Sequence, residues 1–323
     1  MVKIDINNIK NNIENKYWND AQKCKTGILT VLKSQQNQSF LKKGYYNIYK
    51  TLYNSSTGEL NINEIKKLLL ADKNTMELYI KKWGKYNSVQ SNALLKNIFR
   101  FDTLSKRNVI IDILREMKVT VCPYCNRQYI FTLANGKSRP QIDHYYPKII
   151  YPYLALSLYN MVPSCSLCNM SKSSLDTYNM PILYPYLEEM GNEIVFEMKG
   201  IKDCNYVKLL QGLSDEFIIV FKNNKAHNIK SAHNQIDKLH LKELYAEHKD
   251  YVRDIIKSKY VNSTEYLRNL SARFPLLFNS DVEVKNMLYM TDLRKEDWGK
   301  RPLAKLTHDI DMQIEAGNVN EEK

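Results

Sequence analysis

Apolar positions in the first part of the chain recur at helical spacing. Ile65, Leu68 and Leu69 are three and one positions apart, and similar spacing continues to the end of this part. Side chains three or four positions apart share one face of a helix, so the pattern predicts amphipathic helices. The last of them is expected over residues 105–118. We therefore expect residues 1–118 to form a mainly helical N-terminal region.

The pattern becomes strand-like after that region. Residues 128–133 form a strand-like run rich in aromatic and β-branched residues, and Asn135-Gly136 lies just beyond it. An Asn-Gly pair behind a strand-like run is the strongest short-range signal for a β-hairpin. The sequence predicts a hairpin whose second strand covers 137–145.

A helix is expected to follow this hairpin. Prolines interrupt the intervening chain, and helical spacing resumes over 165–175 with Ser164 placed to cap the helix N-terminus. Hairpin, loop and helix together predict a ββα unit within residues 119–180.

The last part, residues 181–323, mixes both patterns. Short runs suited to strands cover 194–198, 206–210 and 216–221, and helical spacing returns from about residue 229. The fold class predicted for the whole chain is α+β, with a central ββα unit, a mainly helical N-terminal region and a mixed C-terminal region.

Composition excludes several classes of protein. The chain has 323 residues, of which 44% are hydrophobic, enough to bury a core, so global disorder is excluded. No apolar run approaches the roughly 18 residues of a membrane span, and the N-terminal sequence lacks the apolar segment of a secretory signal. We expect a cytoplasmic protein with no membrane partner.

The charge is strongly positive. There are 47 Lys and Arg against 35 Asp and Glu, a net charge of +12. Such an excess is typical of proteins that bind a polyanion such as nucleic acid. A coding bias toward Lys, Asn, Ile and Tyr would produce the same excess, so charge alone leaves both interpretations open.

Four of the six cysteines form two C-x-x-C pairs, Cys122 with Cys125 and Cys165 with Cys168. Two residues between ligands let one turn present both thiolates to a tetrahedral zinc ion. A redox dithiol is the alternative, but it needs one pair and a βαβ context. We therefore predict Zn²⁺ with four thiolate ligands. Its role would be structural because no coordination position is left for water or substrate.

The segment between and around these pairs, QIDHYYPKIIYPYLALSLYNMVPSCSLCNMSKSS, carries Asp143, His144, Asn160 and Asn169. In residue types and spacing it resembles the HNH, or ββα-metal, endonuclease family, in its Asp-His-Asn variant with a four-cysteine zinc knuckle. The resemblance implies a zinc-stapled ββα-metal core that hydrolyses DNA phosphodiester bonds with a second, catalytic metal ion.

Each residue of the motif has a chemical reason to be present. Asp143 offers a carboxylate oxygen and Asn169 an amide oxygen, ligands suited to a catalytic Mg²⁺ or Mn²⁺. His144 has an ordinary pKa near 6.5 and suits a general base for water.

Three further residues are assigned supporting roles. By resemblance, Asn160 ties the connecting loop so that the histidine is held in register. Lys172 lies three positions after the amide ligand, on the same helical face, and together with Lys148 is a candidate for contacting phosphates beside the scissile bond.

The C-terminal helical sequence is similar in general character to bacterial HNH proteins of anti-phage defence operons, including Septu-like systems paired with an ATPase. This resemblance implies a defence nuclease with DNA as substrate, gated by a co-encoded ATPase or another activating protein. Two alternatives stay open: a zinc-stapled nucleic-acid-binding or adaptor module without nuclease activity, and an effector active only with its partner ATPase. A single HNH site cuts one strand, so an oligomer is also left open.

Overall fold

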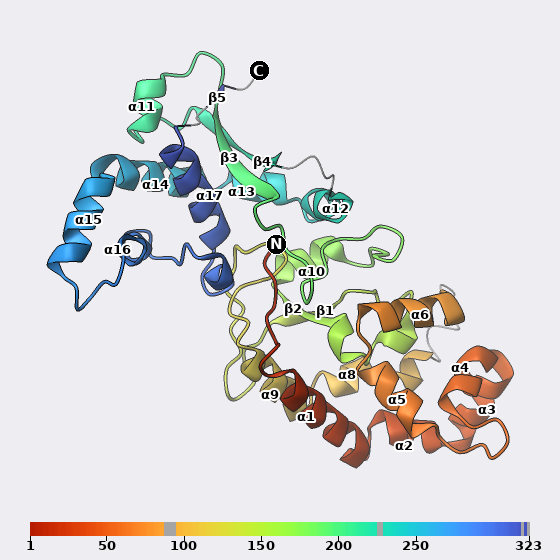
Figure 1. Cartoon of the computed structure of the whole chain (residues 1–323). Helices are drawn as coiled ribbons and strands as arrows, with labels where there is room; N and C mark the ends of the chain where they lie inside the picture. Colours follow the sequence, from red (N-terminus) through yellow and green to blue (C-terminus); the bar gives the residue numbers. More distant parts are fainter. Residues whose placement is uncertain (87–94, 225–228, 318–319, 322–323) are drawn as a thin grey trace. The chain divides into compact units, whose positions relative to one another are not determined.

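The computed structural model describes residues 1–86, 95–224, 229–317 and 320–321 (Figure 1). Its contacts divide the chain into two compact units. Unit 1 comprises Met1–Lys3, Thr120–Tyr129 and Ile182–Lys323, and unit 2 comprises Ile4–Val119 and Ile130–Pro181. Among the residues described, no helix is both long enough and apolar enough to cross a membrane.

Unit 2 begins with a series of short helices, which confirms the helical prediction for this part of the chain. They are α1 (Lys10–Lys23), α2 (Ile28–Lys33), α3 (Gln35–Gly44), α4 (Tyr46–Leu52), α5 (Ile62–Leu69), α6 (Lys73–Trp83), α8 (Phe101–Leu104) and α9 (Asn108–Met117). The amphipathic spacing explains them: α9, for example, buries Ile110, Ile113 and Leu114 on one face. It ends where Lys118 adopts a left-handed conformation with φ of 50°.

Two short strands and a helix complete unit 2. Strand β1 (Gln141–His144) pairs antiparallel with β2 (Met161–Ser164), and helix α10 (Ser166–Lys172) follows and contacts β1. The 3₁₀ turns η1 (Pro152–Leu154) and η2 (Leu158–Asn160) lie in the loop between the strands. This arrangement positions the candidate site.

The predicted hairpin around Asn135-Gly136 is wrong. The dipeptide does form a turn, with Gly136 at φ of 64°, but residues 130–133 are not a strand and only Tyr129 makes an isolated bridge, to Val121. Burial explains the difference. All four residues of β2 are buried, whereas Tyr129, Phe131 and Leu133 of the expected partner are each about half exposed, so pairing with β2 removes more apolar surface from water.

The start and end of α10 also differ from the prediction. Cys165 rather than Ser164 is the N-cap, because its sulfur accepts a hydrogen bond from the Cys168 N–H. The helix ends at Lys172 instead of continuing to residue 175, since Ser173 adopts a left-handed φ of 45°.

Unit 1 contains a three-stranded sheet in the order β4-β3-β5, with β3 (Ile194–Gly200), β4 (Phe217–Asn223) and β5 (Asn320–Glu321). The strands predicted over 194–198 and 216–221 are confirmed, as are helices from residue 229. The helices are α11 (Tyr206–Leu210), α12 (Lys230–Lys238), α13 (Leu241–Ala246), α14 (Lys249–Val261), α15 (Thr264–Arg273), α16 (Asp281–Leu288) and α17 (Ala304–Glu315), with a 3₁₀ turn η3 (Lys295–Asp297).

The strand predicted over 206–210 is wrong, because this segment is helix α11. The Asn205 side chain accepts a hydrogen bond from the Lys208 N–H at 3.0 Å and caps the helix N-terminus. The Asn205 cap stabilises the start of a helix. This stabilisation outweighs the preference of the aromatic and β-branched residues of the segment for a strand.

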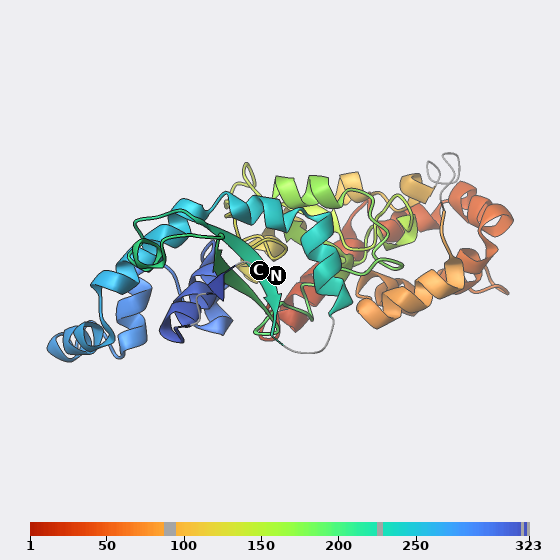
Figure 2. The ribbon, with the colours of Figure 1, turned by 90° about the horizontal axis from the view of Figure 1, so that it is seen from above.

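Helix α17 packs along β3 (Figures 1 and 2). The Asp309 carboxylate accepts from the Phe196 N–H at 2.9 Å, and the Gln313 amide bonds both the N–H and the C=O of Met198. Side chains of the helix therefore bond backbone groups of β3, which fixes the helix on the sheet.

Asn126 ties a loop of unit 1 to the start of α17. Its backbone is left-handed, with φ of 51°, and its side chain is fully buried. The side-chain N–H donates to Trp298 O at 2.7 Å and the side-chain oxygen accepts from the Lys305 N–H at 3.2 Å. The backbone oxygen of Asn126 accepts from the Leu303 N–H.

Candidate functional site

Cys122, Cys125, Cys165 and Cys168 form one buried group whose sulfur atoms all lie within 4.8 Å of one another. A zinc ion with four bonds of about 2.3 Å places its ligands roughly 3.8 Å apart. The group can therefore bind zinc, and it fits the predicted zinc knuckle. Four thiolates would fill the tetrahedral coordination, so this centre offers no position for substrate.

Local backbone geometry presents each pair of thiolates. In the first pair, the Cys122 N–H donates to Gln128 O at 2.9 Å and the Asn126 N–H returns to Cys122 O at 2.8 Å, which closes a tight loop. The Arg127 N–H donates to the Cys125 sulfur at 3.4 Å. In the second pair, one helical turn separates the sulfurs, with Cys165 capping α10.

Asp143 is buried near the end of β1 and faces α10. The Lys172 ammonium lies 3.0 Å from each of the two carboxylate oxygens and donates to His144 O at 2.6 Å. The side chain of Lys172 is completely buried. The candidate phosphate-contacting lysine is therefore, in this structure, the cation that neutralises Asp143, and its phosphate contact stays a prediction.

His144 follows Asp143 at the end of β1 and is also buried. Its Nε2 lies 3.0 Å from Ala155 O, an acceptor, so Nε2 carries the proton and Nδ1 of the neutral ring is the acceptor. The Phe101 ring and the imidazole pack edge-to-face, with their ring centroids 4.3 Å apart.

Burial lowers the pKa of His144 to about 4. Loss of solvation of the charged imidazolium is the main cause, the Ala155 carbonyl opposes it, and the nearby Lys148 ammonium lowers the pKa further. The imidazole is therefore neutral at pH 7, which is the form that accepts a proton.

Asn160 is fully buried in the loop between the strands. Its side-chain oxygen accepts from the Tyr146 N–H at 2.7 Å, and its side-chain N–H groups donate to Tyr146 O and Leu154 O, both at 3.0 Å. These bonds join the chain just after β1 to the loop that contains Ala155, whose carbonyl oxygen accepts the hydrogen bond from His144 Nε2–H.

Asn169 lies on α10, half-buried, one turn before Lys172. Its Nδ2 donates to the Gln141 side-chain oxygen at 2.7 Å. Gln141 and Asp143 are two residues apart on β1 and share a face, so Asn169 and Lys172 both lie over the face that carries Asp143. The bond to Gln141 uses the Asn169 side-chain nitrogen and not its amide oxygen.

Lys148 is partly exposed in the loop after β1. Its ammonium lies 4.5 Å from the centroid of the Phe101 ring and 3.3 Å from the Asp102 carboxylate. The structure thus brings Lys148 near His144 through Phe101. Lys172 instead joins Asp143, and Asn169 joins Gln141.

Sequence reasoning missed three residues around His144 and Asn169. Phe101 and Ala155 cover the imidazole, and Gln141 receives the Asn169 amide. Phe101 and Ala155 are apolar residues within predicted helix or loop, so no local signal marks them. Gln141 had a signal, because it precedes Asp143 by two positions on the same predicted strand.

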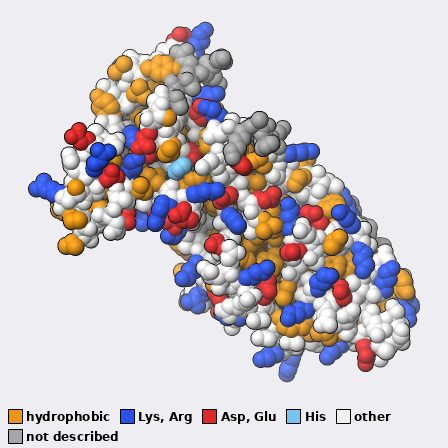
Figure 3. All heavy atoms as spheres, in the orientation of Figure 1, with side chains coloured by type: hydrophobic (Ala, Val, Ile, Leu, Met, Phe, Trp, Pro, Cys, Tyr) orange, Lys and Arg blue, Asp and Glu red, His pale blue; other side chains and the backbone are white. Residues whose placement is uncertain are grey.

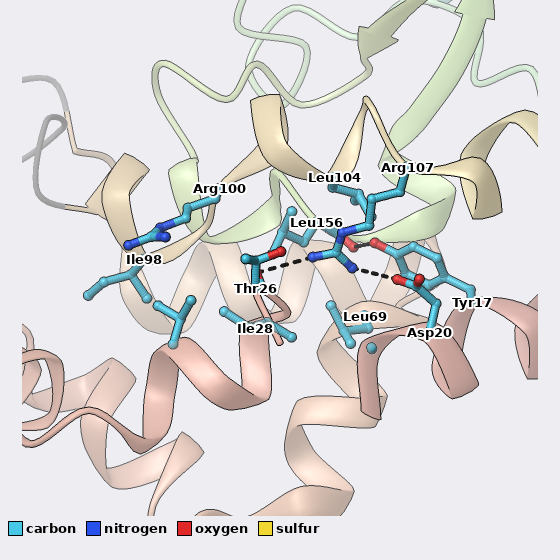
Figure 4. Close-up of a pocket in the computed structure, with 12 residues that line it drawn as sticks. Tyr17, Asp20, Thr26, Ile28, Leu69, Ile98, Arg100, Leu104, Arg107 and Leu156 are labelled. Atoms are coloured by element: carbon cyan, nitrogen blue, oxygen red, sulfur yellow. Dashed lines mark hydrogen bonds and ion pairs between the residues drawn. The ribbon is translucent and has the colours of Figure 1, made fainter. Parts of the chain in front are cut away.

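A small cavity in unit 2 is lined by residues that hold the helices together (Figure 4). Its volume is about 20 Å³, close to the space of a single water molecule. Arg107 spans it, paired with Asp20 and bonded to Thr26 O, while Tyr17 donates to Leu156 O at 2.6 Å. These bonds join α1 to the segment before α9 and to the loop between β1 and β2, and the cavity has no space for a substrate.

Charges of both signs are mixed on one side of the molecule. On the side of the molecule drawn in Figure 3, Lys and Arg side chains are interspersed with Asp and Glu rather than gathered over one element. The positive net charge therefore supports nucleic-acid binding only in general terms.

Comparison with known proteins gives one distant relative. The chain is 26% identical over 175 residues to Septu protein PtuB of Bacillus thuringiensis, a match that covers 54% of this chain and 56% of that protein. The chain thus spans about half the length of the curated relative it matches. No family model matches the chain, and no solved structure matches it. The predicted likeness to Septu proteins is confirmed at this distance, whereas membership of the HNH family stays a prediction.

Proposed function

We propose that the chain is a metal-dependent endonuclease of the HNH type that cleaves DNA phosphodiester bonds in anti-phage defence. The observation that carries this proposal is the end of β1, where a neutral, buried histidine follows a buried carboxylate that faces α10. The likeness to a Septu protein supports the defence role. The four cysteines would hold the structural zinc of the proposed core.

In this proposal His144 is the general base. Its Nε2–H is engaged by Ala155 O, so Nδ1 receives the proton of the attacking water. The water oxygen bonds to phosphorus as the bond to O3′ breaks, and O3′ takes a proton from solvent, which leaves a 5′-phosphate and a 3′-hydroxyl. Asn160 acts as a positioning residue, because its bonds fix the loop that carries Ala155.

The catalytic ion would be Mg²⁺ or Mn²⁺, held by the Asp143 carboxylate and the Asn169 amide oxygen. These oxygen donors lie over the same face of β1 and α10 and fit a hard cation. The bound ion supplies positive charge that polarises the phosphate and stabilises the leaving oxygen. Lys172 occupies the carboxylate that the ion would use, so its ammonium must share or yield that position.

A second candidate function is a zinc-stapled nucleic-acid-binding or adaptor module without nuclease activity. Two observations favour it: the Lys172 ammonium neutralises Asp143, and His144 is 5% exposed. A related form is an effector that becomes active only with a partner, such as a co-encoded ATPase, or as an oligomer. In that form the partner would expose the imidazole and free the carboxylate.

The test is cleavage of supercoiled plasmid DNA by the whole protein with Mg²⁺, Mn²⁺ or EDTA. We expect metal-dependent nicking, and His144→Ala should lower the rate by about 10²-fold or more, since that is the usual contribution of a general base. His233→Ala is the matched control, because His233 lies in unit 1 and contacts Asn223. Zinc content should be the same in all three proteins.

Two results would decide against the nuclease. Nicking by His144→Ala at the wild-type rate removes the general base from the proposal. Wild-type protein that cuts neither alone nor with a co-encoded ATPase and lysate of phage-infected cells is the binding module. Cleavage that appears only on adding the partner identifies the partner-gated effector.

A further inference from the structure

A cavity of about 600 Å³ lies in unit 2, beside the candidate site. Its walls come from residues 96–103, which include α8, and from the loop after β1. Cavities that bind small molecules usually measure roughly 300–1,000 Å³, a range that accommodates a nucleotide. Its size therefore suits a ligand.

The lining of this cavity is cationic. Lys96, Arg100 and Lys148 contribute three positive charges against the single negative charge of Asp102, a net charge of +2 from side chains. The Asp102 side chain is 91% exposed, so water screens its ion pair with Lys148. Arg100 is oriented by a bond of 2.7 Å from its Nε to Asn97 O, and Figure 4 shows it extended away from Arg107. Such a lining suits an anion.

One wall of the cavity is aromatic. Phe101 lies there with the Lys148 ammonium 4.5 Å from its ring centroid. An aromatic ring among cations is the combination that binds single-stranded nucleic acid, because bases stack on the ring and phosphates pair with the cations. A simple phosphate site would need no aromatic surface.

The cavity shares two residues with the surroundings of His144. Phe101 meets the imidazole edge-on and Ala155 accepts its Nε2–H, and both line the cavity. A nucleotide in the cavity would therefore be separated from the imidazole by the thickness of one side chain.

We propose that this cavity binds one nucleotide of a single nucleic-acid strand, with its phosphate on Lys96, Arg100 and Lys148 and its base against Phe101. Binding itself needs no cleavage. Only the further statement, that the bound nucleotide lies beside the bond to be cut, rests on the proposed function. A single strand is favoured because the cavity accommodates one nucleotide and an unpaired base is free to stack on Phe101.

The experiment measures binding of a fluorescein-labelled 12-nucleotide DNA strand to the whole protein by anisotropy, in EDTA and over a series of salt concentrations. The double variant Lys96→Gln/Arg100→Gln removes two of the cavity cations. Lys81→Gln/Lys82→Gln on α6 removes the same charge from exposed positions that do not line the cavity. Thermal melting of both variants checks that each is folded.

We expect the cavity variant to bind at least about tenfold more weakly and the slope of log K against log salt to fall by about 1.4, since each phosphate contact with a single strand contributes about 0.7. The α6 variant should keep its slope within about 0.3 of the wild type. Phe101→Leu should weaken binding at least about fivefold with the slope unchanged, because it removes stacking and no charge.

Equal loss in the two double variants would overturn the proposal, because binding would then follow net charge alone. Tighter binding of a matched duplex than of the single strand would also overturn it. Thymidine monophosphate is used as a competitor. Displacement of the strand from the wild type, with no displacement of the residual binding to the cavity variant, supports the proposal. Single-stranded RNA tested in parallel shows whether the sugar matters.

Failure of this proposal is distinguishable from failure of the nuclease proposal. Strand binding is measured in EDTA, where metal-dependent cleavage cannot occur, so its outcome does not depend on whether the protein is a nuclease. Normal strand binding by the cavity variant in a protein that cuts plasmid DNA would refute the cavity and leave the chemistry standing. Weak binding by that variant in a protein that never cuts supports the cavity without the chemistry.

Discussion

Unit 1 and unit 2 each bury a complete ammonium–carboxylate pair, Lys305 with Asp309 and Lys172 with Asp143. In both pairs the lysine side chain is fully buried and donates to one backbone carbonyl, Gly191 O at 2.7 Å and His144 O at 2.6 Å. The carboxylates differ in how their oxygens meet the ammonium. Asp309 also accepts from the Phe196 N–H and contacts His308 Nδ1 at 3.0 Å. Both oxygens of Asp143 face the one ammonium.

The partners also differ in their separation along the chain. Lys305 and Asp309 are one helical turn apart in α17, where their further bonds hold the helix on β3. Lys172 and Asp143 lie on α10 and β1, 29 positions apart in the chain. Burying an ion pair seldom adds net stability over apolar residues. The pair in unit 1 is explained by the packing of α17, whereas the pair in unit 2 places charge at the end of β1, next to His144.

The largest expected effect comes from removing a cysteine of the helix that carries Lys172. Cys168→Ser should abolish zinc binding and cost roughly 5 kcal/mol or more of stability, since structural zinc contributes about 10–16 kcal/mol in small domains. Hydrogen exchange should then accelerate in α10 and β2, while α17, whose pair lies within one helix on β3, keeps most of its protection. Equal acceleration in α17 would erase the contrast between the two pairs.

Removing each lysine compares the pairs directly. Lys172→Met and Lys305→Met should each cost about 3–5 kcal/mol in EDTA, because each leaves a buried carboxylate without its cation. Millimolar Mg²⁺ should restore about 1–3 kcal/mol to Lys172→Met, as binding to the folded state alone does. It should restore nothing to Lys305→Met. Urea unfolding measures both, and equal response of the two variants to Mg²⁺ would contradict a cation site at Asp143.

Acid should act on the pair in unit 2 through His144. The folded pKa of about 4 lies below the unfolded value of about 6.5, so between these pH values the unfolded chain binds a proton that the folded chain excludes. Stability should fall by about 3 kcal/mol as the pH drops from 7 to 4, mainly because burial removes the solvation of the imidazolium, with a smaller contribution from the nearby Lys148 and Lys172 ammonium groups. His144→Gln should remove this part of the pH dependence in urea unfolding, and an unchanged profile would be the contrary result.

The smallest effect provides the baseline for both buried pairs. Lys242 and Asp237 form an ion pair at 3.0 Å with both side chains more than half exposed. Lys242→Ala should change stability by less than about 0.5 kcal/mol, since water screens the pair. A larger loss of unfolding free energy in the same urea series would show that burial does not explain the larger effects expected for Lys172 and Lys305.

Residues close in sequence were predicted well, and pairings across the chain were not. The two C-x-x-C pairs and the β-branched and aromatic runs of β3 and β4 carry their signal within a few positions, so local sequence alone predicted them. Strand β2 was missed because it is four residues long and contains Pro163, which pairs with Ile142 in a strand that has a partner on one side only. The Asn-Gly turn was a strong local signal for a hairpin that burial overrides.

The contacts of the candidate residues were also beyond prediction from local sequence. The adjacency of Asp143 and His144 is visible in the sequence, but their partners are not. Lys172 was expected to face phosphate, yet its position over β1 brings it to the carboxylate. Phe101 reaches His144 from a helix 43 positions earlier, and nothing in its neighbourhood distinguishes it from a core aromatic.

Asn126 has a consequence for synthesis of the chain. Its side-chain bonds to Trp298 and Lys305 span more than 170 positions, so the loop that presents Cys122 and Cys125 gains these bonds only when the last helix has left the ribosome. At ordinary elongation rates of about 5–20 residues per second, that interval lasts roughly 10–35 seconds. During it the nascent thiols lack those supports and are open to oxidation or to capture of a competing metal, so early zinc supply should govern the yield of correctly folded protein.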